Sequence, residues 1–396
     1  MDLIELPAKQ FASSKCFFSA VSVAALPGPQ HTCQYPSKNP LDGCPKNSIL
    51  VGQDNSVAKF TSIQKAISSL PDDDTAFTIV VLPGNYTEQL NVTRKAAITI
   101  IGQTRSPLAQ SENIVTVYWS SINGANSGLT DNAYTSVLTV APNLNASLTG
   151  SGPTGFPVPA DTPFGNTDFR VYNINFRNIA TEIGAGPSLA VSVSRANAGF
   201  YSCGFYSYQD TVYVGKLGNA YFYGNEIAGQ TDFLYGFGTA WVERSNLALR
   251  RCGGGIIAWK GTNTTFANQY GCYVSNSFIN AANSSIAPQI AGKCSLGRPW
   301  NRQHRSVYSN TFMDASVLAA GYTKWSSNPL TDNYNNYTFM GEYGSYGPGF
   351  NLTARLAGNV TAVLDKKTAN KYRRPQDVFI TEAGKPNVKW IDSRYL

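Results

Sequence analysis

Two aspartates stand out because each is a lone acid in an aromatic, nearly uncharged stretch of the chain. Asp210 lies in "YQDT" and Asp232 in "GQTDF", 22 residues further on. Burial disfavours the charged form of a carboxyl group, and a second carboxylate nearby disfavours it further. If the fold brings the two side chains together, their pKa values should therefore separate. One carboxylate would stay ionised as a nucleophile, and the other would hold a proton as an acid.

A repeated six-residue pattern indicates how the fold brings them together. Each copy opens and closes with an apolar residue and holds small or polar residues, often Asn, between them. The copies occupy residues 171–176, 200–205, 222–227, 242–247, 273–278 and 307–312. A unit of about 20 to 25 residues, lengthened by loops, is the period of a solenoid. Asp210 and Asp232 each follow the end of a unit by five residues, so we expect them on consecutive coils about 4.8 Å apart. The alternative is that both are solvated turn residues.

The expected fold class is all-β, a single-domain right-handed parallel β-helix with one short N-terminal helix. A β-sandwich would need frequent tight hairpins, yet Asn-Gly occurs only at Asn123-Gly124. The runs "FTIVVLPG" and "AITIIGQ" are continuously apolar, which is typical of strands buried on both faces. Residues 119–167 are rich in Ser, Asn, Gly and Pro, and we expect a long surface excursion there.

The helix is expected within "FTSIQKAISSL", and we expect no other substantial one. Its apolar residues recur at helical spacing on one face: Ile63, Ala66, Ile67 and Leu70.

The composition is that of a β-rich, often extracellular protein. Of 396 residues, 42% are hydrophobic and only 14% are charged, against about 25% charged in average soluble domains. The net charge of +7 is dispersed, which disfavours a nucleic-acid partner but leaves a polyanionic substrate open. No apolar run is long enough to span a membrane.

The N-terminal region predicts export. Residues 1–25 contain "KCFFSAVSVAAL", which resembles a signal peptide. Residues 26–48 read as an irregular lead-in and 49–396 as the β-helix domain. Removal of the signal would take away Cys16 and leave six cysteines, an even number that suits an oxidising compartment. Eight glycosylation sequons agree with export: Asn85, Asn91, Asn145, Asn263, Asn283, Asn336, Asn351 and Asn359.

Other catalytic chemistries find little support in the sequence. No cysteine pair is spaced for zinc, and the two histidines, His31 and His304, are expected to be surface or structural groups. The chain has no GxSxG segment, and "RCGGGI" lacks the lysine of a phosphate-binding loop and reads as a turn. We therefore expect no metal and no cofactor.

Five ordered segments carry a family resemblance: "PGNYTE", "YQDTVY", "GQTDFLYG", "LGRPW" and "GEYGSYGPG". With them, the chain resembles the pectin methylesterases, β-helical carboxylesterases that demethylate pectin, over about residues 49 to 350. The similarity is to the short secreted microbial type. It implies a monomer that acts on pectin with no nucleic-acid or membrane partner.

The resemblance also assigns roles to residues. Asp232 would attack the ester carbonyl, while Asp210 would protonate the departing methanol and then activate water. The other implied residues are Arg298, which would pair with Asp232, Gln209, which would donate to the oxyanion, and three aromatic residues lining the substrate cleft, Trp300, Tyr213 and Tyr235. Each of these aromatic residues could instead pack on the β-helix for structural reasons alone.

One departure from the family pattern concerns the oxyanion site. The family has a second glutamine one coil before Gln209, and counting back 22 residues reaches Pro187 in "GPSLAV". A lost oxyanion donor lowers the rate by roughly 10²–10³-fold, although Ser188 or Gln230 could take its place. The sequence thus predicts a working but slowed esterase in which Pro187→Gln raises kcat.

Two other functions stay open on the sequence. A pectin-binding protein with weak or no esterase activity is one, because Pro187 offers no side-chain donor where the family has a glutamine. A polygalacturonase fits poorly, because inverting glycosidases keep their carboxyl groups roughly 6.5–9.5 Å apart.

Overall fold

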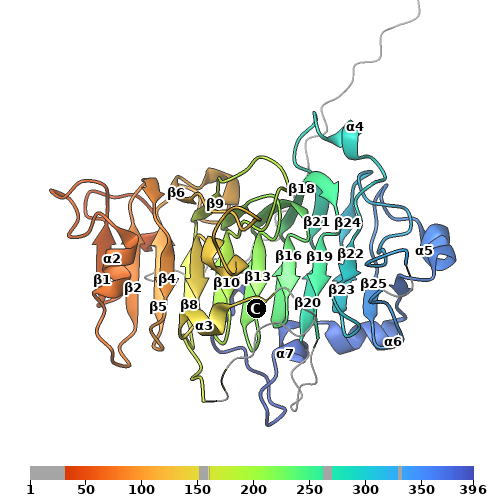
Figure 1. The fold of residues 1–396 in the computed structure, drawn as a ribbon. Helices are drawn as coiled ribbons and strands as arrows, with labels where there is room; N and C mark the ends of the chain where they lie inside the picture. Colours follow the sequence, from red (N-terminus) through yellow and green to blue (C-terminus); the bar gives the residue numbers. More distant parts are fainter. Residues whose placement is uncertain (1–31, 151–158, 160, 262–269, 329–331) are drawn as a thin grey trace, which may run out of the picture.

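The computed structural model describes residues 32–150, 159, 161–261, 270–328 and 332–396, and they form three parallel sheets around one long axis (Figure 1). The predicted signal segment and His31 lie outside the described residues. Successive strands along the chain visit the sheets in turn, and each strand pairs in parallel with its counterpart one coil away. The architecture is the predicted parallel β-helix.

The three sheets have eleven, eight and seven strands. The 11-stranded sheet contains β1 Ser48–Val51, β2 Phe77–Val81, β5 Ile98–Gly102, β8 Phe169–Tyr172, β11 Asn197–Tyr201, β14 Asn219–Tyr223, β17 Thr239–Glu243, β20 Gly271–Ser275, β23 Arg305–Ser309, β25 Phe339–Tyr343 and β26 Ala362–Val363. The 8-stranded sheet contains β3 Gly84–Thr87, β6 Val115–Trp119, β9 Asn175–Asn178, β12 Gly204–Tyr206, β15 Glu226–Thr231, β18 Asn246–Gly253, β21 Phe278–Ala281 and β24 Phe312–Met313. The 7-stranded sheet contains β4 Leu90–Val92, β7 Leu138–Val140, β10 Val191–Val193, β13 Val212–Val214, β16 Leu234–Gly236, β19 Ile257–Trp259 and β22 Gly297–Pro299.

Helices are short and lie outside the coils. They are α2 Ile63–Ser68, α3 Leu144–Ser147, α4 Ala287–Ile290, α5 Leu352–Gly358, α6 Lys366–Ala369 and α7 Pro375–Val378, with 3₁₀ turns η1 Gln110–Glu112, η2 Asn132–Thr135, η3 Asn370–Tyr372 and η4 Ser393–Tyr395. The predicted helix is α2, with Ile63, Ala66 and Ile67 buried. The expectation of a single substantial helix was wrong, because α5 is one residue longer and is capped by the Asn351 side chain. Its exposed Leu352 and Leu356 obscured the apolar face that would have predicted it.

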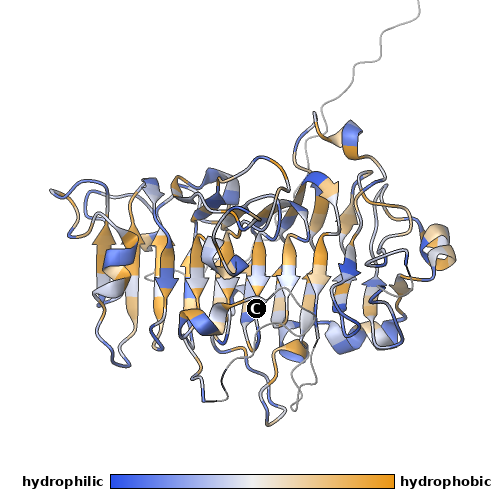
Figure 2. Ribbon diagram, viewed as in Figure 1, coloured by the Kyte–Doolittle hydropathy of each residue, from blue (hydrophilic) through white to orange (hydrophobic). Residues whose placement is uncertain are grey.

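The interior is a stack of like side chains, one per coil, and apolar strands cross the whole length of the molecule (Figure 2). Phe200 stacks on Phe222 with ring centroids 5.0 Å apart, and Phe176 stacks on Phe205 at 5.7 Å. Parallel strands in register place equivalent residues directly above one another, so the repeat in the sequence becomes a ladder in space.

A left-handed residue marks the bend between the 11-stranded and 8-stranded sheets on successive coils. These residues have φ between 47° and 63°: Asn173, Ser202, Gly224, Arg244, Asn276, Asn310 and Gly344. Asn and Gly adopt this conformation more readily than other residues, which explains Asn173, Asn276 and Asn310 of the repeat but not Asn225 or Asn246, which lack positive φ.

Two details of the expected organisation were wrong. The sequence alignment placed Tyr273 opposite Val242, but the pairing is Val242 with Val274 and Trp241 with Tyr273. Two adjacent apolar residues made both registers plausible, and a slip of one residue exchanges the faces of a strand. The 119–167 segment is also more than a surface excursion, because it contributes the fully buried strand β7 to the 7-stranded sheet.

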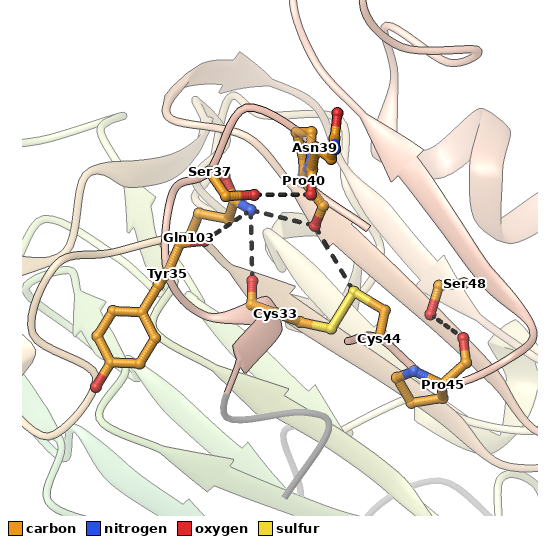
Figure 3. Close-up of a disulfide and its surroundings, with 9 residues drawn as sticks. All are labelled: Cys33, Tyr35, Ser37, Asn39, Pro40, Cys44, Pro45, Ser48 and Gln103. Atoms are coloured by element: carbon orange, nitrogen blue, oxygen red, sulfur yellow. Dashed lines mark hydrogen bonds between the residues drawn. A yellow bond between two sulfur atoms is a disulfide. The ribbon is translucent and has the colours of Figure 1, made fainter. Parts of the chain in front are cut away.

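The described cysteines form two disulfides, Cys33–Cys44 and Cys252–Cys294, while Cys203 and Cys272 are buried thiols. Gln103, which directly follows β5, donates from its amide to the carbonyl oxygens of Cys33 and Tyr35 (Figure 3). The lead-in is therefore fastened to the body of the fold.

The C-terminal segment returns to the middle coils and covers the outer face of the 11-stranded sheet (Figure 1). Tyr201 stacks on Tyr395 at 4.8 Å, and the Tyr201 hydroxyl accepts a hydrogen bond from the backbone N–H of Asp392 at 2.7 Å. Tyr172 donates to the Asp392 carboxylate at 2.6 Å.

Candidate active site

Asp210 and Asp232 occupy equivalent turns between the 8-stranded and 7-stranded sheets. The pairing of Val212 with Leu234 and of Gln209 with Thr231 puts the two aspartates at the same position on consecutive coils, as predicted. Both residues have positive φ, 61° and 48°. Aspartate tolerates this conformation better than most residues, and such strained positions cluster at functional sites. Both side chains are buried, with 8% and 7% of the residue surface exposed.

Asp232 accepts three hydrogen bonds. Arg298, on β22, donates from Nε to Oδ1 at 3.0 Å and from Nη2 to Oδ2 at 2.6 Å. The backbone N–H of Gly255 donates to Oδ1 at 3.0 Å. A forked guanidinium aligned on both oxygens both stabilises the charge and fixes the orientation of the carboxylate.

The glycine run "RCGGGI", which the sequence suggested was only a turn, forms part of this site. Gly254 has φ of +59°, and a Cβ there would lie 2.6 Å from Asp232 Oδ1 and 2.7 Å from Arg298 Nη2. The run follows Cys252, whose disulfide to Cys294 ties the loop to the segment before Arg298. Glycine is required here because the backbone passes directly against the ion pair.

Asp210 has a different environment from its neighbour. Burial, and then the charge of Asp232, raise its pKa well above the usual range, while Arg298 acts in the opposite direction. Asn132 Nδ2 lies 3.4 Å from its Oδ2. Burial and the neighbouring charge thus favour the protonated form of Asp210.

An aromatic cluster borders the pair. Trp300 is half-buried and lies 5.6 Å from Tyr235 between ring centroids, and Tyr235 lies 4.8 Å from Tyr213. Tyr213 and Tyr235 are only 1% and 2% exposed, so within this cluster Trp300 presents more surface to a ligand than they do.

Sequence reasoning missed several neighbours of the site. The Trp325 ring lies 4.1 Å from the Arg298 guanidinium carbon, and the Lys260 ammonium lies 3.2 Å from the centroid of Trp300. Burial, reinforced by the charge of Lys216, lowers the pKa of Lys260 to about 7. Lys260 could have been noticed in the sequence, because it is a single charged residue in the apolar stretch "IIAWKG".

Pro187 and Ser188 lie on the coil next to that of Gln209. Ser188 N–H donates to the Gln209 carbonyl just as Asp210 N–H donates to that of Thr231, so Pro187 sits one coil from Gln209, in agreement with the count along the sequence. Ser188 is buried and its hydroxyl bonds Ser207 at 2.7 Å.

Gln230, the second suggested replacement, accepts a hydrogen bond from the Gly184 N–H at 3.1 Å. His304 is buried, with Nδ1 accepting from the Trp259 N–H at 3.1 Å, and is structural as expected.

Comparison with known proteins identifies the family of the chain. The family model for Pectinesterase matches residues 156–382, more than half of the chain and a span that includes the aspartate pair and Arg298. The chain belongs to the pectinesterase family. It is 28% identical over 362 residues to the pectinesterase of Aspergillus aculeatus, covering 89% of this chain and 93% of that one. It is 29% identical to probable pectinesterase A of Neosartorya fischeri over 76% of this chain and 80% of that one.

A solved structure has the same fold. The pectin methylesterase from Aspergillus niger superposes with a TM-score of 0.65 and 24% identity, covering 89% of this chain and 98% of that one. This pectinesterase is a carboxylic ester hydrolase, and its reaction is the hydrolysis of the methyl esters of pectin.

Proposed function

We propose that Asp232 is the nucleophile and Asp210 the general acid and base of this pectinesterase. The observation that carries the proposal is the contrast between them: Asp232 is gripped by the Arg298 fork, whereas burial and the neighbouring charge favour a proton on Asp210. A pair of titratable groups with such different environments suits an acid and a nucleophile.

The reaction would proceed in two halves. An Asp232 oxygen attacks the ester carbonyl carbon, and the carbon–methoxy bond breaks as Asp210 gives its proton to the leaving oxygen, releasing methanol. The acyl-enzyme is a mixed anhydride of Asp232 and galacturonate. Asp210, now ionised, takes a proton from water as the water attacks the anhydride, which frees galacturonate and restores both residues.

Gln209 would donate to the oxyanion from its half-buried position beside Asp210. Trp300 would stack on the sugar ring, with Tyr235 and Tyr213 packed against it.

We also propose that the protein is secreted and acts as a monomer. Seven of the eight sequon asparagines lie in the described residues, and all seven are exposed, which supports glycosylation in a secretory pathway. The two disulfides support an oxidising compartment. Over the described residues, none of the helices has the length and apolar character needed to cross a membrane.

The test is methanol release from highly methylated pectin, measured in parallel with new reducing ends. We expect methanol without reducing ends from the parent, and essentially none from Asp232→Asn, which should still fold and bind pectin. An Asp232→Asn variant with more than about a tenth of the parental kcat would remove Asp232 from the mechanism, because loss of a nucleophile costs far more than that. Binding without methanol in the parent would favour the pectin-binding alternative.

A further inference from the structure

An amide group from the segment before β7 reaches the acid of the catalytic pair. Asn132 Nδ2 lies within hydrogen-bonding distance of Asp210 Oδ2, at 3.4 Å. Asn132 precedes β7 and Asp210 precedes β13, and β10 lies between these strands in the 7-stranded sheet. The Asn132 side chain therefore crosses the coil of β10, which is the coil where Pro187 offers no donor.

The orientation of this amide is determined by a second asparagine. Asn123 Nδ2 donates to Asn132 Oδ1 at 2.8 Å, and Asn123 Oδ1 in turn accepts from the Ser127 hydroxyl at 3.1 Å. Because the oxygen of Asn132 is occupied, its NH₂ group must face Asp210. An amide nitrogen carries two hydrogens. One can bond Asp210, and the other, which also has the Tyr235 hydroxyl as a neighbour, can donate to a substrate atom beside Asp210.

The backbone of this segment is seated on Pro187 itself. The Asn123 N–H donates to the Pro187 carbonyl at 2.8 Å. A Cβ on the preceding Gly186 would lie 2.4 Å from the Asn123 carbonyl oxygen, so the close approach depends on glycine. The coil that contains Pro187, and lacks a side-chain donor there, thus binds the segment that carries Asn123 and Asn132.

Asn132 is itself rigidly placed. Asp131 is buried and caps η2 by accepting from the Ala133 N–H at 2.8 Å, and the Thr135 hydroxyl donates to the Asn132 carbonyl at 2.7 Å. Asn132 is half-buried, so part of the residue is accessible to solvent. The Ser188 hydroxyl, by contrast, is buried and bonds the Ser207 hydroxyl at 2.7 Å.

We propose that Asn132 is the second oxyanion donor of this esterase and acts in place of the glutamine absent at Pro187. The inference rests on the proposed roles of Asp232 and Asp210. When Asp232 attacks the ester, negative charge develops on the former carbonyl oxygen. A prepositioned donor stabilises that charge more than it stabilises the substrate, so the contribution is to kcat.

The experiment uses three substitutions in the full chain: Asn132→Ala, Pro187→Gln, and both together. Asn132→Ala should lower kcat by about 10²-fold or more while KM changes little. Pro187→Gln alone should have little effect, which reverses the expectation from the sequence, because the position is already served. In the Asn132→Ala background the same glutamine should restore kcat at least about tenfold, since it supplies the missing donor.

Asn143→Ala is the matched control. Asn143 is exposed and caps α3 in the same segment, but makes no contact with the catalytic pair among the described residues. This variant should keep the parental kcat, and circular dichroism should show that all variants are folded.

Three outcomes would overturn the proposal. One is an Asn132→Ala variant with kcat within about threefold of the parent. The second is a large gain from Pro187→Gln in the parent, which would mean that the site lacked a donor. The third is a loss in Asn132→Ala that appears as a shifted alkaline limb of the pH–rate profile, where Asp210 loses its proton, and is not rescued by glutamine, because Asn132 would then only position Asp210. Failure of the proposed function is separate, since it appears as unaffected methanol release in Asp232→Asn.

Discussion

In the proposed catalytic pair, two chemically identical side chains have different surroundings. Asp232 receives the Arg298 fork and the Gly255 N–H, whereas Asp210 has one long hydrogen bond, from Asn132. Burial, and then the charge of Asp232, raise the pKa of Asp210, so the surroundings of the two carboxyl groups differ more than their local sequences do.

Arg298→Lys should therefore damage catalysis although it keeps the charge. An ammonium cannot align on both oxygens of Asp232 as the guanidinium does, so we expect kcat to fall by about tenfold or more. Arg170→Lys is the control. Arg170 donates two hydrogen bonds to the Asp168 carboxylate, at 2.7 and 2.9 Å, in the same geometry but near the C-terminal segment. Parental kcat in Arg298→Lys would make Arg298 a structural residue only.

Asp210→Asn should abolish most activity and yet stabilise the protein. Because the pKa of Asp210 is raised in the native state, the native protein keeps a proton that the unfolded chain releases above about pH 4. Stability is therefore lost as pH rises from that value through the native pKa. The neutral asparagine avoids this loss. Thermal unfolding from about pH 3 to pH 8 should show equal stability at the acid end and a growing advantage for Asp210→Asn above it. An advantage that shrinks with rising pH would contradict this account.

At the scale of elements, the site depends on loops that pass very close to it. Gly254, after β18, lies against both members of the ion pair, and the disulfide Cys252–Cys294 joins this loop to the segment that enters β22. Loops on a rigid scaffold commonly carry function, and here the coils supply the rigidity.

Gly254→Ala should lower kcat by about 10²-fold or more, because its Cβ would displace Asp232 and Arg298. The matched control is Gly292→Ala. Gly292 has a similar φ of +69°, but an added Cβ meets nothing within 4 Å. Both variants should lose about 1 kcal/mol or more of stability from backbone strain, measured by urea unfolding, and only Gly254→Ala should lose activity. Equal activities would show that the close contact at Gly254 is unimportant.

At the scale of the whole molecule, the C-terminal segment covers part of the outer face of the 11-stranded sheet. Tyr172, Tyr201 and Tyr395 form the contact between the outer face of the 11-stranded sheet and the final residues. The middle coils, which carry the proposed active site, therefore depend on residues far away in the sequence.

Tyr201→Phe should lower the free energy of unfolding by about 1–3 kcal/mol, because the buried N–H of Asp392 loses its acceptor. The urea transition should stay single with an unchanged m value, and kcat should be parental. Tyr337→Phe, at a residue with 77% exposure, is the control and should change stability by less than about 0.5 kcal/mol. Equal stability of the two variants would show that the C-terminal contact contributes little.

The sequence by itself determined the coil, because a repeat reports which residues stack on which. Equal spacing after the units at 200–205 and 222–227 was enough to place Asp210 and Asp232 together. It was insufficient where neighbouring apolar residues allowed two registers, as at Tyr273 and Val274. Only the tertiary structure decided which loop groups meet the pair. Asn132 lies 78 residues from Asp210, in a segment without periodicity. It is oriented by Asn123, whose backbone in turn contacts Gly186 and Pro187. Contacts between distant, irregular segments leave no pattern in the chain, whereas stacked strands leave one at every turn.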